Sequence, residues 1–118
     1  MIVIPGDLVD LNTYINAERT NRYVAAGLKR SQTEIVAYYA RHKKPVPSYP
    51  VRVVYRWYMR DSRKDIDNVA FAKKFINDGL VEVGVLKGDS QRFVSAFRDE
   101  FYIDKENPRI EVDFEAIA

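Results

Sequence analysis

The chain has 118 residues, a length that suits one domain built on one hydrophobic core. Hydrophobic residues make up 47% and charged residues 31%, which excludes a disordered or fibrous protein. The sequence has no cysteine, which excludes disulfides, thiolate zinc sites and cysteine nucleophiles. Any metal must therefore be held by oxygen ligands or by the single His42, and oxygen ligands favour Mg²⁺, Mn²⁺ or Ca²⁺.

The net charge of +2 hides an uneven distribution along the chain. Residues 19–64 carry 12 basic and two acidic residues, whereas residues 65–118 carry 12 acidic and seven basic residues. A basic segment of this kind is typical of a protein that binds nucleic acid, because phosphate contacts supply most of the nonspecific affinity. The alternative is a solvated surface that carries these charges without a ligand.

The first half of the chain contains two predicted strands around one predicted helix. Residues 2–4 form a short strand, and a helix capped by Asn12 or Thr13 runs towards Lys44. Three prolines within residues 45–50 exclude a continuing helix. In residues 51–59 apolar side chains alternate with others, which predicts a strand with one buried face.

The second half begins with a predicted helix from Asp67 towards Val83, whose apolar residues lie within one arc. A loop over residues 86–90 and strands over residues 93–97 and 109–115 follow. The order β-α-β-α-β-β predicts a single α+β domain over residues 1–118, with two main helices on a mixed β-sheet. The amino end is too short for a signal-peptide core and no apolar run would span a membrane, so we expect a cytoplasmic protein.

Three aspartates form the candidate site. Asp65 and Asp67 stand at the start of the second predicted helix, where the helix dipole favours negative charge, and Asp89 lies in the loop after that helix. One simple alternative is that Asp67 only caps the helix. A cap does not explain the other two acids, and three carboxylates can chelate one hard cation such as Mg²⁺ for phosphodiester hydrolysis.

Lys74 follows Asp67 by seven residues, which places both on nearly the same line of one continuous helix. Its ammonium would then approach a metal-bound phosphate. Lys73 and Lys74 would otherwise be an exposed basic pair. Phe71 is predicted on the same outer face, where it would stack on an unpaired base or pack at a dimer contact.

Further basic residues are candidates for contacts with DNA phosphates. We expect Arg52 and Arg56 to pair with acids of the last strand instead, and His42 to be a surface residue. Arg60, Arg63 and Lys64 have no matching acids apart from Asp61, which favours phosphate contacts. The full set of predicted DNA-binding residues is Arg19, Arg22, Lys29, Arg30, Arg60, Arg63, Lys64, Lys73 and Phe71.

Residues 65–91 carry a recognisable pattern: Asp-Ile-Asp-Asn opens a helix, Lys74 lies within it, and Gly-Val-Leu-x-x-Asp-Ser-Gln closes it. This run resembles the RusA family of Holliday-junction resolvases. The stretches at residues 11–15, 18–23, 99–101 and 107–112 resemble its phage-borne branch, so nearly the whole chain is covered.

The resemblance implies a homodimeric, Mg²⁺-dependent endonuclease that nicks four-way DNA junctions symmetrically in recombination and repair. Mn²⁺ is a possible substitute, and no small-molecule cofactor is implied. Carried over, the catalytic residues are Asp65, Asp67, Asp89 and Lys74, and the three aspartates are the metal ligands. Three residues are inserted before Lys74 relative to the best-known members, which leaves Lys73 as the alternative lysine. Gly88 stands where relatives often carry another acid or Asn, which leaves Asp89 as the only carboxylate on its loop.

Two other functions remain open at this point. The chain would be a branched-DNA-binding protein of the same fold without nuclease activity if the aspartates were only structural. Asp-x-Asp also occurs in nucleotide-sugar transferases, but 118 residues leave no room for their sugar-nucleotide domain. Metal-dependent cleavage of DNA separates the first two possibilities.

Overall fold

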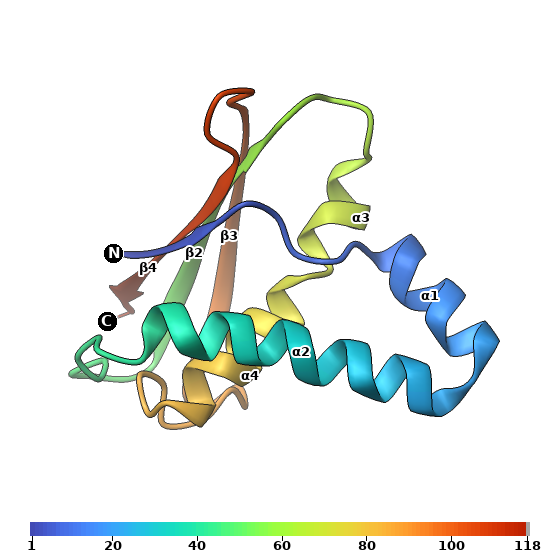
Figure 1. Ribbon diagram of the computed structural model, residues 1–118. Coiled ribbons are helices and arrows are strands. Elements are labelled where there is room, and N and C mark those ends of the chain that lie inside the picture. The colour runs from blue at the N-terminus through green and yellow to red at the C-terminus, as the bar shows by residue number, and fades with distance from the viewer. Residues whose placement is uncertain (118) are drawn as a thin grey trace.

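A four-stranded mixed sheet forms one layer of the molecule, and four helices form the other (Figure 1). The computed structural model describes residues 1–117, and Ala118 lies outside the described residues. The strands are β1 (Ile2–Pro5), β2 (Val51–Met59), β3 (Val94–Ile103) and β4 (Arg109–Ala116). The helices are α1 (Leu11–Thr20), α2 (Arg22–Ala40), α3 (Ile66–Ala70) and α4 (Lys73–Glu82). The predicted single α+β domain with a mixed sheet is confirmed.

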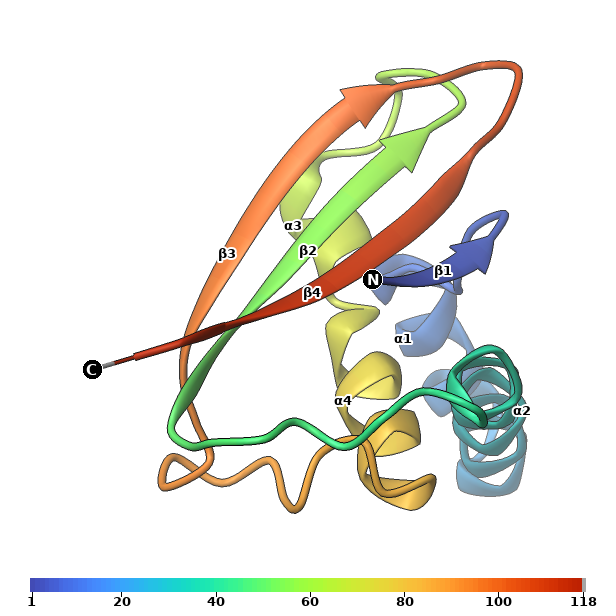
Figure 2. The ribbon, with the colours of Figure 1, turned by 90° about the vertical axis from the view of Figure 1, so that its left-hand side faces the viewer.

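The strands lie in the order β1-β4-β2-β3. Strand β2 is parallel to β3 and antiparallel to β4, and β4 is antiparallel to β1. All the helices lie on one side of this sheet (Figure 2). The loop from β3 to β4 crosses the end of β2, where the Asp104 amide donates to the Met59 carbonyl at 2.8 Å. The end of β2 therefore lies beneath this loop.

Strand β2 supplies the centre of the hydrophobic core, as its alternating sequence predicts. Val53, Tyr55 and Trp57 point towards the helices and are buried, whereas Arg52 and Arg56 point to the helix-free face. Tyr55 is 0% exposed, and burial raises the pKa of its phenol. The protonated hydroxyl donates to the side-chain oxygen of Asn77 in α4, which satisfies both buried groups.

Helices α2 and α4 pack closely because of Gly79. A Cβ atom on Gly79 would lie 2.7 Å from side-chain carbons of Val36, which is too close for any substitution without movement. Gly84, with φ of +79°, follows α4 in the left-handed conformation that commonly ends a helix. Within residues 1–117, no helix combines the length and hydrophobicity needed to cross a membrane.

The first predicted helix is interrupted in the structure, and both of its predicted ends are wrong. Asn21 is extended, with φ of −171° and ψ of 163°, and divides it into α1 and α2. The Asn21 side-chain oxygen accepts hydrogen bonds from the amides of Tyr23 and Val24, so Asn21 caps α2. Asp10, rather than Asn12 or Thr13, caps α1, and α2 ends at Ala40 rather than near Lys44.

The second predicted helix is also divided. Helix α3 ends at Ala70 and α4 begins at Lys73, with Phe71 and Ala72 between them. Ala72, Ile76 and Leu80 of the predicted apolar arc are buried against the sheet, so the packing face is confirmed. Strand β3 is longer than predicted and continues beyond Phe97 to Ile103, paired with β2 over most of its length.

Candidate active site

Two exposed carboxylates stand at the start of α3. Asp65 occupies the capping position, but its side chain makes no capping hydrogen bond. Asp67 lies in the first turn, and its Oδ1 accepts only the amide of Asn68, at 2.9 Å. Within residues 1–117 neither carboxylate has an ion-pair partner. The simple alternative that Asp67 caps the helix is wrong, since Asp65 occupies that position.

The region that leads into α1 fixes the start of α3. The Asn68 side-chain oxygen accepts the amide of Asn12 at 2.9 Å, and Lys64 Nζ lies 2.8 Å from Asp10 Oδ2. Burial alone would raise the pKa of Asp10, but hydrogen bonds from Lys64 and Thr13 hold that pKa below its ordinary value. The same bond raises the pKa of Lys64. The prediction that Lys64 has no matching acid is therefore wrong.

Lys74 lies in the first turn of α4 among carboxylates. Its Nζ is 3.2 Å from Asp78 Oδ1 and 3.9 Å from Asp89 Oδ2, and 56% of its side chain is exposed. The prediction that Asp67 and Lys74 lie on the same side of a helix assumed one continuous helix. The interruption at Phe71 and Ala72 removes the basis for that prediction. Lys74 nevertheless lies beside Asp89, which the sequence alone placed in a separate loop.

Lys73 has a different environment from Lys74. Its Nζ donates to Asp99 Oδ2 at 2.6 Å, and both side chains are about four-fifths buried. Trp57 Nε1 donates to the other oxygen of Asp99 at 2.9 Å, and Lys73 also lies over the ring of Phe97. Asp99 thus joins α4 to two strands. Sequence analysis missed it because the predicted strand ended at Phe97.

The three predicted metal ligands do not form one cluster. Asp65 and Asp67 stand at the start of α3, whereas Asp89 follows α4 beside Lys74. Across residues 1–117, no three acidic or histidine side chains lie close enough together to hold one metal ion. The assignment of these aspartates to a metal therefore stays a prediction. His42 is exposed, as expected for a surface residue.

The predicted DNA-binding cations differ in how far they are already paired. Within residues 1–117, the described ion pairs include none for Arg19, Arg30 or Arg60, and all three are exposed. The other predicted contacts have partners: Arg22 lies over the Tyr23 ring, Lys29 lies 4.0 Å from Asp78, and Arg63 lies 3.8 Å from Asp61. The first three are the cations most available to a ligand.

Phe71 does not lie on an outer face with Lys74. It is half-buried, and its ring lies 5.4 Å from that of Tyr14 and 5.5 Å from that of Phe75. The turn between α3 and α4 directs it towards α1 instead of solvent. The predicted outward orientation is therefore wrong, and contacts within the chain account for this aromatic residue.

The helix-free face of the sheet carries a network of ion pairs. Arg52 lies 3.1 Å from Glu115, and Arg56 lies 3.2 Å from Glu111 and also pairs with Asp113. In both cases the arginine on β2 and the glutamate on β4 are direct cross-strand neighbours. The prediction that Arg52 and Arg56 are used in pairing is confirmed.

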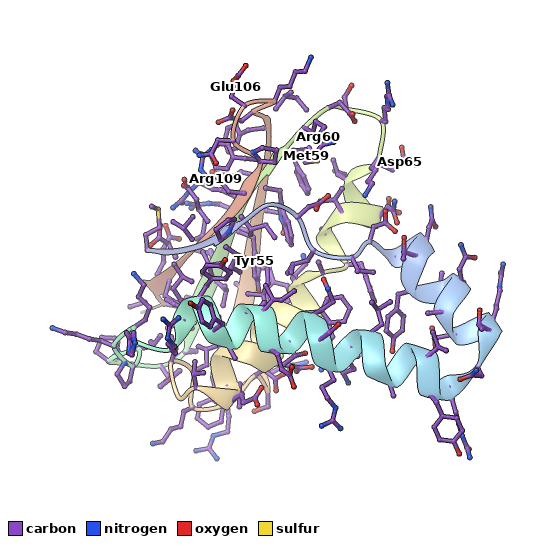
Figure 3. The ribbon with its side chains drawn as sticks, viewed as in Figure 1. Tyr55, Met59, Arg60, Asp65, Glu106 and Arg109 are labelled. Carbon is purple, nitrogen blue, oxygen red and sulfur yellow. The ribbon has the colours of Figure 1, made fainter. Side chains whose placement is uncertain are left out.

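A cavity of about 490 Å³ lies near the start of α3, where sequence analysis predicted none. It is formed by residues 6–10, the end of β2 with the residues that follow, Val69 of α3, and residues 106–110. Met59, Arg60, Glu106 and Arg109 lie at this end of the sheet, with Asp65 at the start of α3 (Figure 3). No local pattern could have found it, because its walls come from four separated segments.

The exposed carboxylates at the start of α3 and the unpaired arginines are residue types that metal-assisted chemistry on phosphate groups uses. Residues 7–115 match the family model described as endodeoxyribonuclease RusA. The chain therefore belongs to the RusA family, whose members are endodeoxyribonucleases that act on Holliday junctions. A comparison with curated proteins found no match to the chain.

Proposed function

We propose that this chain is a Mg²⁺-dependent Holliday-junction resolvase that makes paired symmetric nicks in branched DNA during recombination and repair. The observation that carries the proposal is the family match, because residues 7–115 include every proposed catalytic residue. A homodimer is part of the proposal, since a four-way junction has approximate twofold symmetry and paired nicks need two related sites. We also propose a cytoplasmic protein of phage or prophage origin.

The donor chemistry at the start of α3 fits Mg²⁺. This ion is usually held by one or two carboxylates, with water and substrate phosphate oxygens in its other positions. Asp65 and Asp67 are exposed and have no cation partner within residues 1–117, so both carboxylates are available as ligands. Bound Mg²⁺ would neutralise charge on the phosphate and activate a water molecule.

Asp89 is proposed as the third ligand on the family resemblance alone. Its carboxylate lies 3.9 Å from Lys74 Nζ, so Lys74 balances its charge in this structure. To join Asp65 and Asp67 it would have to leave that position. Mn²⁺ is the expected substitute for Mg²⁺, since both prefer oxygen ligands.

The cations of the chain would bind and orient the DNA. Lys74, whose side chain is 56% exposed, would contact the phosphate that is cut and stabilise the negative charge that develops on it. Arg60 would contact a neighbouring phosphate and set the position of the strand. The exposed Arg19 and Arg30 would attract the DNA backbone over a longer distance.

The test uses a labelled synthetic four-way junction and a matching linear duplex, each incubated with the purified protein and either Mg²⁺ or EDTA. Asp67→Asn is compared with Glu82→Gln, the same change from carboxylate to amide at an exposed position on α4. We expect Mg²⁺-dependent, symmetric nicks in the junction only. Asp67→Asn should lower the rate about a hundredfold or more, because metal assistance is worth several kcal/mol, whereas Glu82→Gln should match the unmodified chain.

Junction binding without cleavage in any divalent metal would overturn the nuclease proposal and favour the non-catalytic DNA-binding protein. Nicking by Asp67→Asn at the normal rate would remove Asp67 from the metal site. Size-exclusion chromatography with light scattering, run on the same preparation, tests the dimer separately.

A further inference from the structure

The cavity beside α3 has the size and the walls of a ligand site. Its volume of about 490 Å³ falls within the ~300–1,000 Å³ typical of small-ligand pockets. Apolar walls come from Leu8, Trp57, Met59, Val69, Pro108 and Ile110. Lys64 and Val69 also line it, and they flank Asp65 and Asp67 in the sequence. The cavity is therefore lined by residues next to the proposed metal ligands in the sequence.

Several charged groups around the cavity already have partners. Lys64 pairs with Asp10 at 2.8 Å, and Arg109 pairs with Asp104 at 2.8 Å and with Glu111 at 2.9 Å. These residues hold the walls together and are not free to bind a ligand.

Three charged side chains of the lining remain free. Within residues 1–117, Asp7, Arg60 and Glu106 have no described ion pair, and the side chains of all three are exposed. Two carboxylates and one guanidinium are therefore exposed at the edge of the cavity. Because the acids outnumber the cation, a phosphate inside the cavity would be repelled. A neutral ring that donates hydrogen bonds would be bound.

A nucleobase has this chemistry. Its planar ring suits the apolar walls, and an exocyclic amine donates to a carboxylate in the way that Asp and Glu accept from base amines. The exposed Arg60 is available for the phosphate of the same nucleotide. Moving a base out of its stack costs least where the strands already separate, as they do at a branch point.

We propose that this cavity binds one unstacked base of the DNA strand beside the nicked phosphodiester, and that Asp7 and Glu106 favour bases with an exocyclic amine over thymine. The inference rests on the proposed function, because it requires a DNA strand at Asp65 and Asp67. It adds a specificity site to that function and is separate from the metal ligands.

Trp57 provides a direct test, because it is the only tryptophan of the chain and lines the cavity. The full chain is titrated in EDTA with four-way junctions that carry each of the four bases, or an abasic site, at successive positions around the nick. We expect saturable quenching of tryptophan fluorescence by the junctions with an amine-bearing base. At one position, thymine or an abasic site should weaken the junction affinity measured by this quenching about tenfold.

Glu106→Gln and Asp7→Asn test the two carboxylates, with Glu18→Gln on α1 as the matched control outside the cavity. An amide both donates and accepts hydrogen bonds, so each variant should reduce the preference against thymine about fivefold, and the control should keep it. Equal affinity for all bases and the abasic site would overturn the proposal. Quenching by free nucleosides but not by junctions would also overturn it, since the cavity would then serve a free ligand.

Nicking in Mg²⁺ is measured on the same junctions. If the protein nicks the junctions but shows no base preference, only the base site is rejected. Absence of nicking would reject the proposed nuclease, while the fluorescence readout in EDTA would still decide whether a base enters the cavity.

Discussion

The helix-free face of the sheet and the region around the start of α3 both carry charges of both signs, but they use them differently. On the sheet face, Arg52 and Arg56 of β2 pair with acids that lie directly opposite on β4. Around α3, the described contacts leave Asp65, Asp67 and Arg60 without ion pairs. The first arrangement stabilises the protein, whereas the second leaves charge available for a metal ion and DNA. Pairing, more than composition, separates the charges used within the fold from those that remain available to a ligand.

The largest effect on stability should come from the sheet face. Arg56→Ala would leave Glu111 and Asp113 without this partner on a partly buried surface, where the Arg56 side chain is only 20% exposed. We expect the free energy of unfolding to fall by about 2 kcal/mol, below the range for a fully buried pair because the site is partly solvated. Urea denaturation measures it, and junction affinity should change little. A loss below about 0.5 kcal/mol would show that the pairs do not stabilise the sheet.

For the unpaired Arg60 we expect the opposite result, a small effect on stability and a larger effect on junction affinity. Arg60→Ala should change the free energy of unfolding by less than about 0.5 kcal/mol, because Arg60 is exposed. Junction affinity should fall about fivefold, and the slope of log K against log salt should become shallower by about one, as for the loss of one phosphate contact. Fluorescence anisotropy at several salt concentrations tests both. An unchanged salt slope would remove Arg60 from the DNA-binding surface.

The Lys64 and Asp10 pair should contribute less to stability than the Arg56 pairs, because the Lys64 side chain is more exposed than that of Arg56. The pKa of Asp10 is lowered in the folded chain, so the pair stabilises the fold above the ordinary aspartate pKa of 3.8. This stabilisation is lost as the pH falls through the lowered value. Lys64 is 47% exposed, so Lys64→Met should cost no more than about 1 kcal/mol at pH 6.

Urea denaturation of both proteins between pH 6 and pH 2.5 tests this pH dependence. The difference in stability between Lys64→Met and the unmodified chain should shrink as Asp10 is protonated. A difference that stays constant across this range would mean that Lys64 stabilises the fold through its hydrocarbon stem rather than its charge.

Sequence patterns correctly predicted the elements in which the spacing of apolar residues matches the buried face. The alternation in residues 51–59 located β2, and acids at matching positions in residues 109–115 predicted the partners of Arg52 and Arg56. Asn21 is unfavourable inside a helix, but a continuous helix was predicted because apolar residues continue on both sides of it. The Asn21 side chain instead caps a new helix. The break in the second helix was not predicted either, and there the Phe71 ring packs against Tyr14 of α1.

The contacts that build the candidate site were harder to predict, because they join distant segments. The sequence around Lys64 does not indicate that Asp10 is its ion-pair partner. The sequence around Lys73 likewise does not indicate that Asp99 is its partner. The sequence indicated which residue types lie at the start of α3. Which of their charges remain free depends on how α1, α4 and β3 pack around them.

The strand order has a consequence for how the chain folds during synthesis. Among the elements of residues 1–117, strand β1 is synthesised before the others, and it pairs only with β4, which is synthesised after them. The backbone hydrogen bonds of β1 to β4 therefore cannot form until β4 has been synthesised. Such non-local pairing slows folding because a long loop must close first. We therefore expect the helices and the β2 and β3 pair to order before β4 enters the sheet, with β1 joining last.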